Sequence, residues 1–326
     1  MKKILSAILC FALLISALAL VGCGEKSLKL GLGVVISGAD ANDATEDTDA
    51  IATVDVTAAA VLVDNDGKIV KCVIDTITNE ASYTALGTAN AAGEFKTKYE
   101  QGDAYGMVAY GGATLEWFEQ VDAFCSVVAG KTVDEVKGLV VNGYYGNEDV
   151  KAAGCTIGVA DFVKAVEKAV ANAADSNATE SCKLGLGMVT DQTNTNSVDG
   201  KPGSIELDTT IFVTATDKDN KIVAAESDVA VVEFGFTDMG ETTFDSTKEI
   251  KTKREQGDDY GMVEYAGSEL EWYAQADAFE AQCFGKTASE LNSLMASDYK
   301  GNEDVKAAGC TIYVSAFISA AVKAAG

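Results

Sequence analysis

The residues of this chain with the clearest potential for chemistry lie in a twelve-residue stretch that occurs twice. Positions 146–157 and 301–312 share the sequence GNEDVKAAGCTI without a difference. Each stretch contains a carboxylate, a flexible glycine, a thiol and a hydroxyl: Asp149, Gly154, Cys155 and Thr156 in the first, and Asp304, Gly309, Cys310 and Thr311 in the second. Because the two copies keep this loop identical while most of their other loops differ, the stretch predicts a functional site that is present twice.

Composition excludes several kinds of chemistry. The chain has no histidine, which removes histidine-based triads and histidine-ligated zinc or haem. Its 50 acidic residues outnumber 25 basic ones, and Arg254 is its single arginine, so no basic surface is available for the phosphates of a nucleic acid. The aspartates of residues 64–67 and 217–219 lack the spacing of a calcium loop and predict turns. We therefore expect no metal site and no nucleic-acid partner, and an electron carrier or binding protein rather than an enzyme with its own substrate.

The repeat extends far beyond these stretches. Residues 96–108 (KTKYEQGDAYGMV) match residues 251–263 (KTKREQGDDYGMV), and Leu-Gly-Leu-Gly occurs at residues 30–33 and again at 184–187. A repeat of this length is the size of a domain, so each copy is expected to close its own core. The predicted boundaries are 29–173 for the first repeat domain, 174–182 for a small polar linker and 183–326 for the second repeat domain.

Each copy has a strand-rich front and a helical back. Residues 54–62 alternate up to an Asp-Asn-Asp-Gly turn and residues 69–74 return, which predicts a β-hairpin, and the second copy repeats it. Helical spacing follows at residues 117–128 and 272–279 and again near each copy's end. Thr132 with Glu135, and Thr287 with Glu290, predict capping boxes at helix starts. The expected fold class is α+β: two tandem copies of one domain, each an antiparallel β-hairpin or sheet packed with helices.

The N-terminus predicts the compartment. Lys2 and Lys3 precede an apolar run over residues 4–21, as in a secretory signal peptide. The run ends in Leu-Val-Gly-Cys at residues 20–23, which resembles the lipobox of bacterial lipoproteins, whose cysteine is acylated and becomes the mature N-terminus. This implies a signal peptide over 1–22, lipidation of Cys23, a lipidated tether over 23–28 and a membrane-anchored protein at the outer face of the cytoplasmic membrane or the cell surface.

Six cysteines remain after loss of Cys10 and acylation of Cys23. Only Cys155 and Cys310 are at equivalent positions, and no CxxC spacing occurs, so no shared disulfide framework is visible. Most of these thiols are expected to be small buried side chains, with one unassigned disulfide left open.

The segment from Asp149 to Ala169 resembles the C-terminal end of the FMN-binding domain of Rnf complexes, sodium-translocating NADH:quinone reductase and lipoproteins of flavin-based extracellular electron transfer. The shared features are an aspartate, a small-residue loop ending in threonine and a helix, together with a strand–Asp-Gly-Lys-Ile–strand unit at residues 61–69. In that family the threonine carries FMN through a phosphoester. This chain departs from the family pattern by having alanine for serine at positions 153 and 308, and cysteine for alanine at 155 and 310.

The resemblance implies covalent FMN at Thr156 and Thr311, added by a flavinyl transferase and reduced by a membrane electron donor. Aromatic side chains expected near the flavin ring are Trp117, Trp272, Tyr105 and Tyr260. The alternative, a cofactor-free tandem-domain lipoprotein that binds a ligand or partner at the cell surface, stays open.

Overall fold

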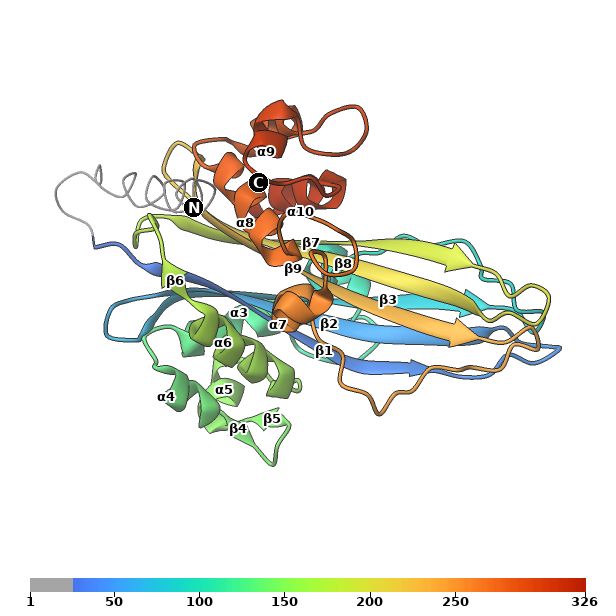
Figure 1. Cartoon of the computed structure of the whole chain (residues 1–326). Coiled ribbons are helices and arrows are strands. Elements are labelled where there is room, and N and C mark those ends of the chain that lie inside the picture. The colour runs from blue at the N-terminus through green and yellow to red at the C-terminus, as the bar shows by residue number, and fades with distance from the viewer. Residues whose placement is uncertain (1–25) are drawn as a thin grey trace.

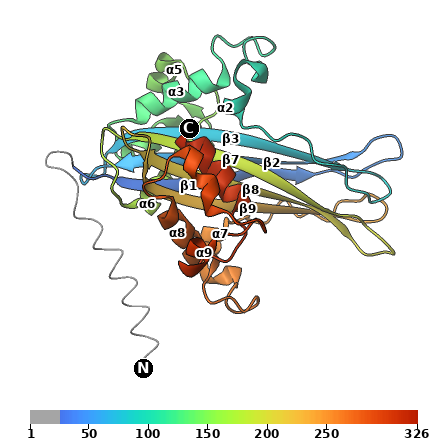
Figure 2. The same ribbon diagram turned by 90° about the horizontal axis from the view of Figure 1, so that it is seen from above.

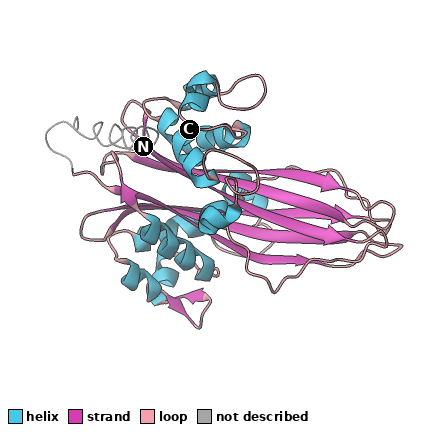
Figure 3. Cartoon of the chain, viewed as in Figure 1, coloured by secondary structure: helices cyan, strands magenta, loops and turns pink. Residues whose placement is uncertain are grey.

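The computed structural model describes residues 26–326, and the predicted signal peptide and Cys23 lie outside the described residues. The fold is α+β, as predicted (Figures 1 and 3). Each copy opens with a three-stranded antiparallel meander: β1 (Lys29–Ala41), β2 (Ala50–Val63) and β3 (Ile69–Tyr83), then β7 (Lys183–Thr195), β8 (Gly203–Thr216) and β9 (Ile222–Phe236). The predicted hairpins are therefore confirmed, with a third strand in each copy.

Side-chain oxygens build the hairpin turns. Asp64 Oδ1 accepts from the backbone N–H groups of Asp66 at 2.9 Å and Lys68 at 2.8 Å. Asp217 Oδ1 accepts in the same way from Asp219 and Lys221, both at 2.9 Å. These aspartates serve as turn residues, in agreement with the turn predicted from their sequence.

The helices follow the strands in each copy. The first copy has α2 (Lys98–Gln101), η2 (Gly102–Tyr105), α3 (Trp117–Val128), α4 (Val133–Lys137), α5 (Glu148–Ala153) and α6 (Ala160–Asn172), with a small hairpin of β4 (Val140–Val141) and β5 (Tyr145–Gly146). The second has α7 (Lys253–Gln256), η3 (Gly257–Tyr260), α8 (Trp272–Cys283), η4 (Ala288–Leu294), α9 (Glu303–Ala307) and α10 (Ser315–Ala325). Both predicted capping boxes are present, although the one at Thr287 begins a 3₁₀ helix.

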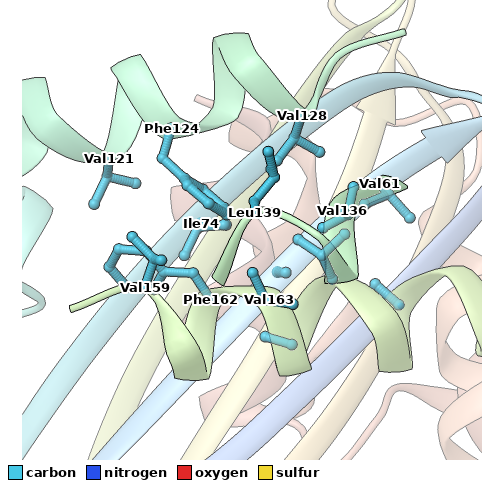
Figure 4. Close-up of a cluster of buried hydrophobic side chains, with 14 of the residues drawn as sticks. Val61, Ile74, Val121, Phe124, Val128, Val136, Leu139, Val159, Phe162 and Val163 are labelled. Carbon is cyan, nitrogen blue, oxygen red and sulfur yellow. The ribbon is translucent and has the colours of Figure 1, made fainter. Parts of the chain in front are cut away.

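The two sheets pack face to face, and the helices of each copy cover the outer face of its own sheet near one end of the strands (Figures 1 and 2). One hydrophobic cluster fills the space between sheet and helices in the first copy, around Phe124 and Phe162 (Figure 4), and another does so in the second, around Phe279 and Phe317. Two further clusters lie between the sheets and draw residues from both copies.

The prediction that each copy closes its own core as a separate domain is therefore wrong. Leu32 and Leu62 of the first copy share one cluster with Met188 and Val213 of the second. The clusters between the sheets are apolar, and exposing them to water would be unfavourable for either copy alone. Packing the two sheets against each other buries these residues in both copies.

The segment predicted as a small polar linker is also packed. β6 (Ala174–Asp175) pairs with the start of β1, and Leu28 N–H donates to the carbonyl of Ala178 at 2.8 Å. Ala178 and Cys182 are buried. The connection thus extends the first sheet instead of separating two independent bodies.

The Leu-Gly-Leu-Gly motifs allow the last helix of each copy to lie directly on the first strand. A Cβ atom at Gly33 would lie 2.0 Å from the carbonyl oxygen of Ala165 on α6, and one at Gly187 would lie 2.1 Å from that of Ala320 on α10. Any larger residue would push the helix away from the sheet.

Among residues 26–326, no helix is both long and apolar enough to cross a membrane.

Candidate functional site

The identical stretches form a short helix and the turn that leads from it toward the last helix of each copy. Gly154 and Gly309 end α5 and the turn after α9 with φ angles of +114° and +108°, a region that favours glycine. Asp149 and Asp304 lie exposed in the first turn of α5 and α9, where a negative charge stabilises the helix N-terminus. Both aspartates therefore have a local role in the helix.

The two cysteines of the stretches point into the cores. Cys155 and Cys310 are fully buried in the sheet–helix clusters of their copies. Burial raises the pKa of each thiol to about 11, so both are protonated and unreactive at neutral pH. The structure places them away from the surface at which a cofactor was expected.

The threonines lie at the surface and are held by a glutamine. The backbone N–H of Thr156 donates to Gln120 Oε1 at 2.9 Å, and the Thr156 hydroxyl lies 3.1 Å from the same oxygen. Thr311 and Gln275 repeat this arrangement at 2.9 and 3.0 Å. Both threonines are exposed, whereas both glutamines are buried on α3 and α8.

The predicted aromatic residues meet as a cluster in each copy, with a lysine that sequence reasoning missed. Trp272 is buried, and Lys253 Nζ lies 5.8 Å from its ring centroid and 5.2 Å from that of Tyr260. In the first copy Lys98 lies 5.9 Å from Trp117 and 5.5 Å from Tyr105. These distances are typical of cation–π contacts. The signal was in the sequence, because both lysines lie in the repeated KTK triplet.

A cavity of about 670 Å³ opens beside this cluster in the second copy. Its walls contain five aromatic side chains, those of Tyr260, Tyr265, Trp272, Tyr313 and Phe317. Ile312, the neighbour of Thr311, also lines it. A cavity of this size and lining accommodates a small organic molecule.

Polar groups enter the cavity from strand β8 and its neighbours. Asp208 lines the cavity, and its Oδ1 atom is buried without a hydrogen-bond partner. Burial raises the pKa of Asp208, while the charge of Lys253 opposes the shift. An unpartnered carboxylate oxygen in such a place is costly unless a ligand or proton satisfies it.

The first copy differs at this point, and the strand register shows why. Asp55 is the counterpart of Asp208 and is paired across the strands with Thr78, whose hydroxyl donates to Asp55 Oδ1. In the second copy Asp208 is paired with Val231, which has no hydroxyl to donate. The two copies therefore share an aspartate at this position, and only the second leaves it without a partner.

The loop amides decide how well the site fits a phosphoester of FMN at the threonines. In the first copy the N–H groups of Gly154 and Cys155 donate to the carbonyls of Lys151 and Val150, and that of Thr156 donates to Gln120 Oε1. The second copy repeats these three hydrogen bonds. An ester at Thr156 would lose the hydroxyl proton and place anionic oxygens against Gln120 Oε1. Gln120 is held in this orientation because its Nε2 donates to the carbonyl of Leu115 at 3.0 Å. The loop therefore offers no free donors for a phosphate, and the fit is poor.

Comparison with known proteins yields one partial similarity. The chain is similar to the chlorophenol reductase of Desulfitobacterium hafniense, with 33% identity over 125 residues that cover 34% of this chain and 37% of that protein. The aligned part thus spans little more than a third of that relative's length. No protein-family model and no solved structure matches the chain. Among residues 26–326, no cluster of three or more cysteine or acidic residues is arranged to hold a metal ion.

Proposed function

We propose that the chain is a lipid-anchored extracytoplasmic binding protein whose site is the aromatic cavity of the second copy. Its ligand is a small planar organic molecule that carries an O–H or N–H donor. The observation that carries this proposal is Asp208, which lines the cavity and whose Oδ1 atom is buried without a hydrogen-bond partner.

The cavity combines two kinds of recognition. The aromatic side chains of the walls, of which Tyr265 and Tyr313 are exposed, supply apolar area for a ring, and Asp208 supplies one acceptor that fixes its orientation. A ligand donor to the Asp208 carboxylate would offset part of the cost of its burial. The similarity to a chlorophenol reductase supports an aromatic hydroxyl compound as the first class to test, since that relative's name denotes a phenol as its substrate.

The test is a titration with 2-chlorophenol, followed by tryptophan fluorescence and calorimetry. We expect saturable binding that is weakened about tenfold or more by Asp208→Ala, in line with about 1–3 kcal/mol for a buried hydrogen bond. Val231→Thr is the more specific variant, because its hydroxyl can donate to Asp208 as that of Thr78 donates to Asp55 in the first copy. It should weaken binding without changing a residue that lines the cavity. Trp117→Phe, in the first copy, is the matched control and should leave binding intact. Equal losses from variants in both copies, or no binding of any such ring compound, would contradict the proposal.

The predicted lipid anchor places this site close to a membrane. Cys23 precedes the start of β1 by a few residues, and β1 starts at the end of the sheets that carries the helices (Figure 1). Labelling with a fatty-acid analogue should mark the wild-type protein and fail with Cys23→Ser. Retention of the label in that variant would exclude acylation at this cysteine.

An FMN-carrying electron-transfer protein is the second candidate, because Thr156 and Thr311 are exposed, although the loop amides leave no donor free for a phosphate. A flavinyl transferase would have to attach the flavin to these threonines. Coexpression with such a transferase should then add one FMN mass per threonine, falling stepwise in Thr156→Val and Thr311→Val. Unchanged mass with full 2-chlorophenol binding would leave the binding protein as the function.

A further inference from the structure

Two thiols of the first copy meet between its sheet and its helices. Cys72 lies on β3, and Cys125 lies on α3 beside Phe124, and both pack against the hydrophobic cluster that joins the two elements. Figure 4 shows Phe124 pointing from the helix toward the strand that carries Ile74. The thiol of Cys125 lies close enough to that of Cys72 for the two to interact. Their sulfur atoms are thus already neighbours in the folded chain.

This pair is not part of the scaffold that the two copies share. The counterparts of Cys72 and Cys125 in the second copy are Ala225 and Glu280. The other four thiols of residues 26–326 differ from the pair because they are all buried: Cys155, Cys182, Cys283 and Cys310. Cys72 and Cys125 are the two cysteines with partial exposure.

We propose that Cys72 and Cys125 are a disulfide-forming pair that closes when the chain meets an oxidising compartment. The oxidant is a small or protein disulfide. In the first step the Cys72 thiolate attacks one sulfur of that disulfide, and the other sulfur leaves as a thiolate. In the second step the Cys125 thiolate attacks the sulfur of Cys72 and releases the second thiolate. The protein loses two protons and two electrons, and the oxidant becomes two thiols.

The order of these steps follows from access. Cys72 lines a cavity of about 500 Å³ together with Tyr99 and Asp122, so a small disulfide can reach its sulfur. Cys125 does not line that cavity. The neighbouring Cys72 thiol and burial both raise the pKa of Cys125, which makes Cys125 the poorer nucleophile until Cys72 has reacted.

The bond would tie strand β3 to helix α3 in the first copy alone. It would close a loop that contains the rest of β3, α2, η2 and most of α3, and so restrict the unfolded chain. The second copy has no such link. Oxidation should therefore stabilise the two copies unequally.

The experiment treats the mature chain with oxidised glutathione and maps its peptides by mass spectrometry without reduction. We expect a linked pair of peptides containing Cys72 and Cys125 that together lack two hydrogen atoms, and a higher unfolding midpoint that dithiothreitol reverses. Cys125→Ala should stop at a mixed disulfide between glutathione and Cys72. In Cys72→Ala, the remaining Cys125 should stay unreacted. Cys182→Ala is the control and should oxidise like the wild type.

Two results would overturn the proposal. One is alkylation of both Cys72 and Cys125 in the chain after oxidation. The other is a link from Cys125 to Cys155 instead of Cys72. The wild-type peptide map distinguishes these outcomes even if a cysteine variant fails to fold.

Discussion

The ammonium group of Lys168, on α6 of the first copy, lies 2.6 Å from the carboxylate of Glu255, on α7 of the second. The equivalent pair with the copies exchanged, Lys323 and Glu100, has the same separation of 2.6 Å. Each lysine also donates to a backbone carbonyl of its own first strand, at Val34 and Met188. The two copies are thus related by an approximate twofold axis, as the subunits of a symmetric dimer would be.

These ion pairs should contribute little individually and should depend on salt. A double-mutant cycle with Lys168→Ala and Glu255→Ala is expected to give a coupling energy of about 0.5 kcal/mol, since both side chains are about a third exposed or more. Urea denaturation at low salt and at about 1 M salt measures it, because salt at that level screens exposed charges. A coupling above about 3 kcal/mol, unchanged by salt, would show that the pair behaves as a buried one.

Gly33→Ala should be strongly destabilising. Its Cβ would meet the Ala165 carbonyl oxygen at 2.0 Å, and both atoms belong to rigid elements that must separate. We expect a loss of about 3 kcal/mol or more in the free energy of unfolding, at the upper end for overpacking. Gly93→Ala is the matched control, because its Cβ would have no neighbour within 4 Å, and its effect should stay within about 0.5 kcal/mol. Similar unfolding midpoints for the two variants would contradict the close packing of α6 on β1.

The buried aspartates Asp75 and Asp228 should make stability fall as pH rises. Burial raises the pKa of both to about 6, above their unfolded value of 3.8. The folded chain therefore holds more protons than the unfolded chain between about pH 4 and 6, and the free energy of unfolding decreases across that window. Each group accounts for about 3 kcal/mol by the conversion of about 1.4 kcal/mol per pKa unit.

Asparagine variants test this pH dependence. Asp75 Oδ1 accepts from the backbone N–H groups of Thr76 and Tyr99, and an asparagine oxygen can accept the same bonds. Asp75→Asn and Asp228→Asn should therefore fold and flatten the pH dependence between about pH 4 and 6. An unaltered slope in the double variant, followed by chemical denaturation at each pH, would assign the dependence to other groups.

Arg254 should be needed for the stability of the fold only while its acidic partners are present. Its guanidinium lies 2.6 Å from the buried Glu280 and 2.8 Å from Asp277, and the positive charge opposes the rise that burial causes in the pKa of Glu280. Arg254→Leu leaves that carboxylate buried without its cation and should cost about 3–5 kcal/mol. The unfolding midpoint in urea measures the loss.

The first copy offers a matched rescue for this variant. Glu226 is a further acidic neighbour whose charge acts on Arg254. The counterparts of Glu226, Arg254 and Glu280 are Val73, Tyr99 and Cys125, none of which carries a buried charge at neutral pH. The triple variant Glu226→Val, Arg254→Tyr and Glu280→Cys should recover most of the stability lost in Arg254→Leu. If the triple variant does not recover this stability, the three charged side chains stabilise the surrounding structure by more than they cost to bury.

The sequence by itself determined the local structure and the duplication. Alternating residues around Val56 predicted strands, helical spacing of Trp117 and Phe124 predicted α3, and Thr132 with Glu135 predicted a capping box, because these signals depend on residues a few positions apart. Burial of the loop cysteines fits the expectation that most thiols are small core side chains. The signal peptide and lipidation at Cys23 stay predictions.

Only the tertiary structure decided how the two copies are joined and where the candidate site lies. The face-to-face contact of the sheets depends on apolar faces far apart in the chain, and a period-two pattern does not say which surface covers it. Asp55 and Asp208 look alike in sequence, and they differ because the strand register places Thr78 beside one and Val231 beside the other. Hydrogen-bond partners across strands are set by register, which is a property of the folded sheet and not of the residue itself.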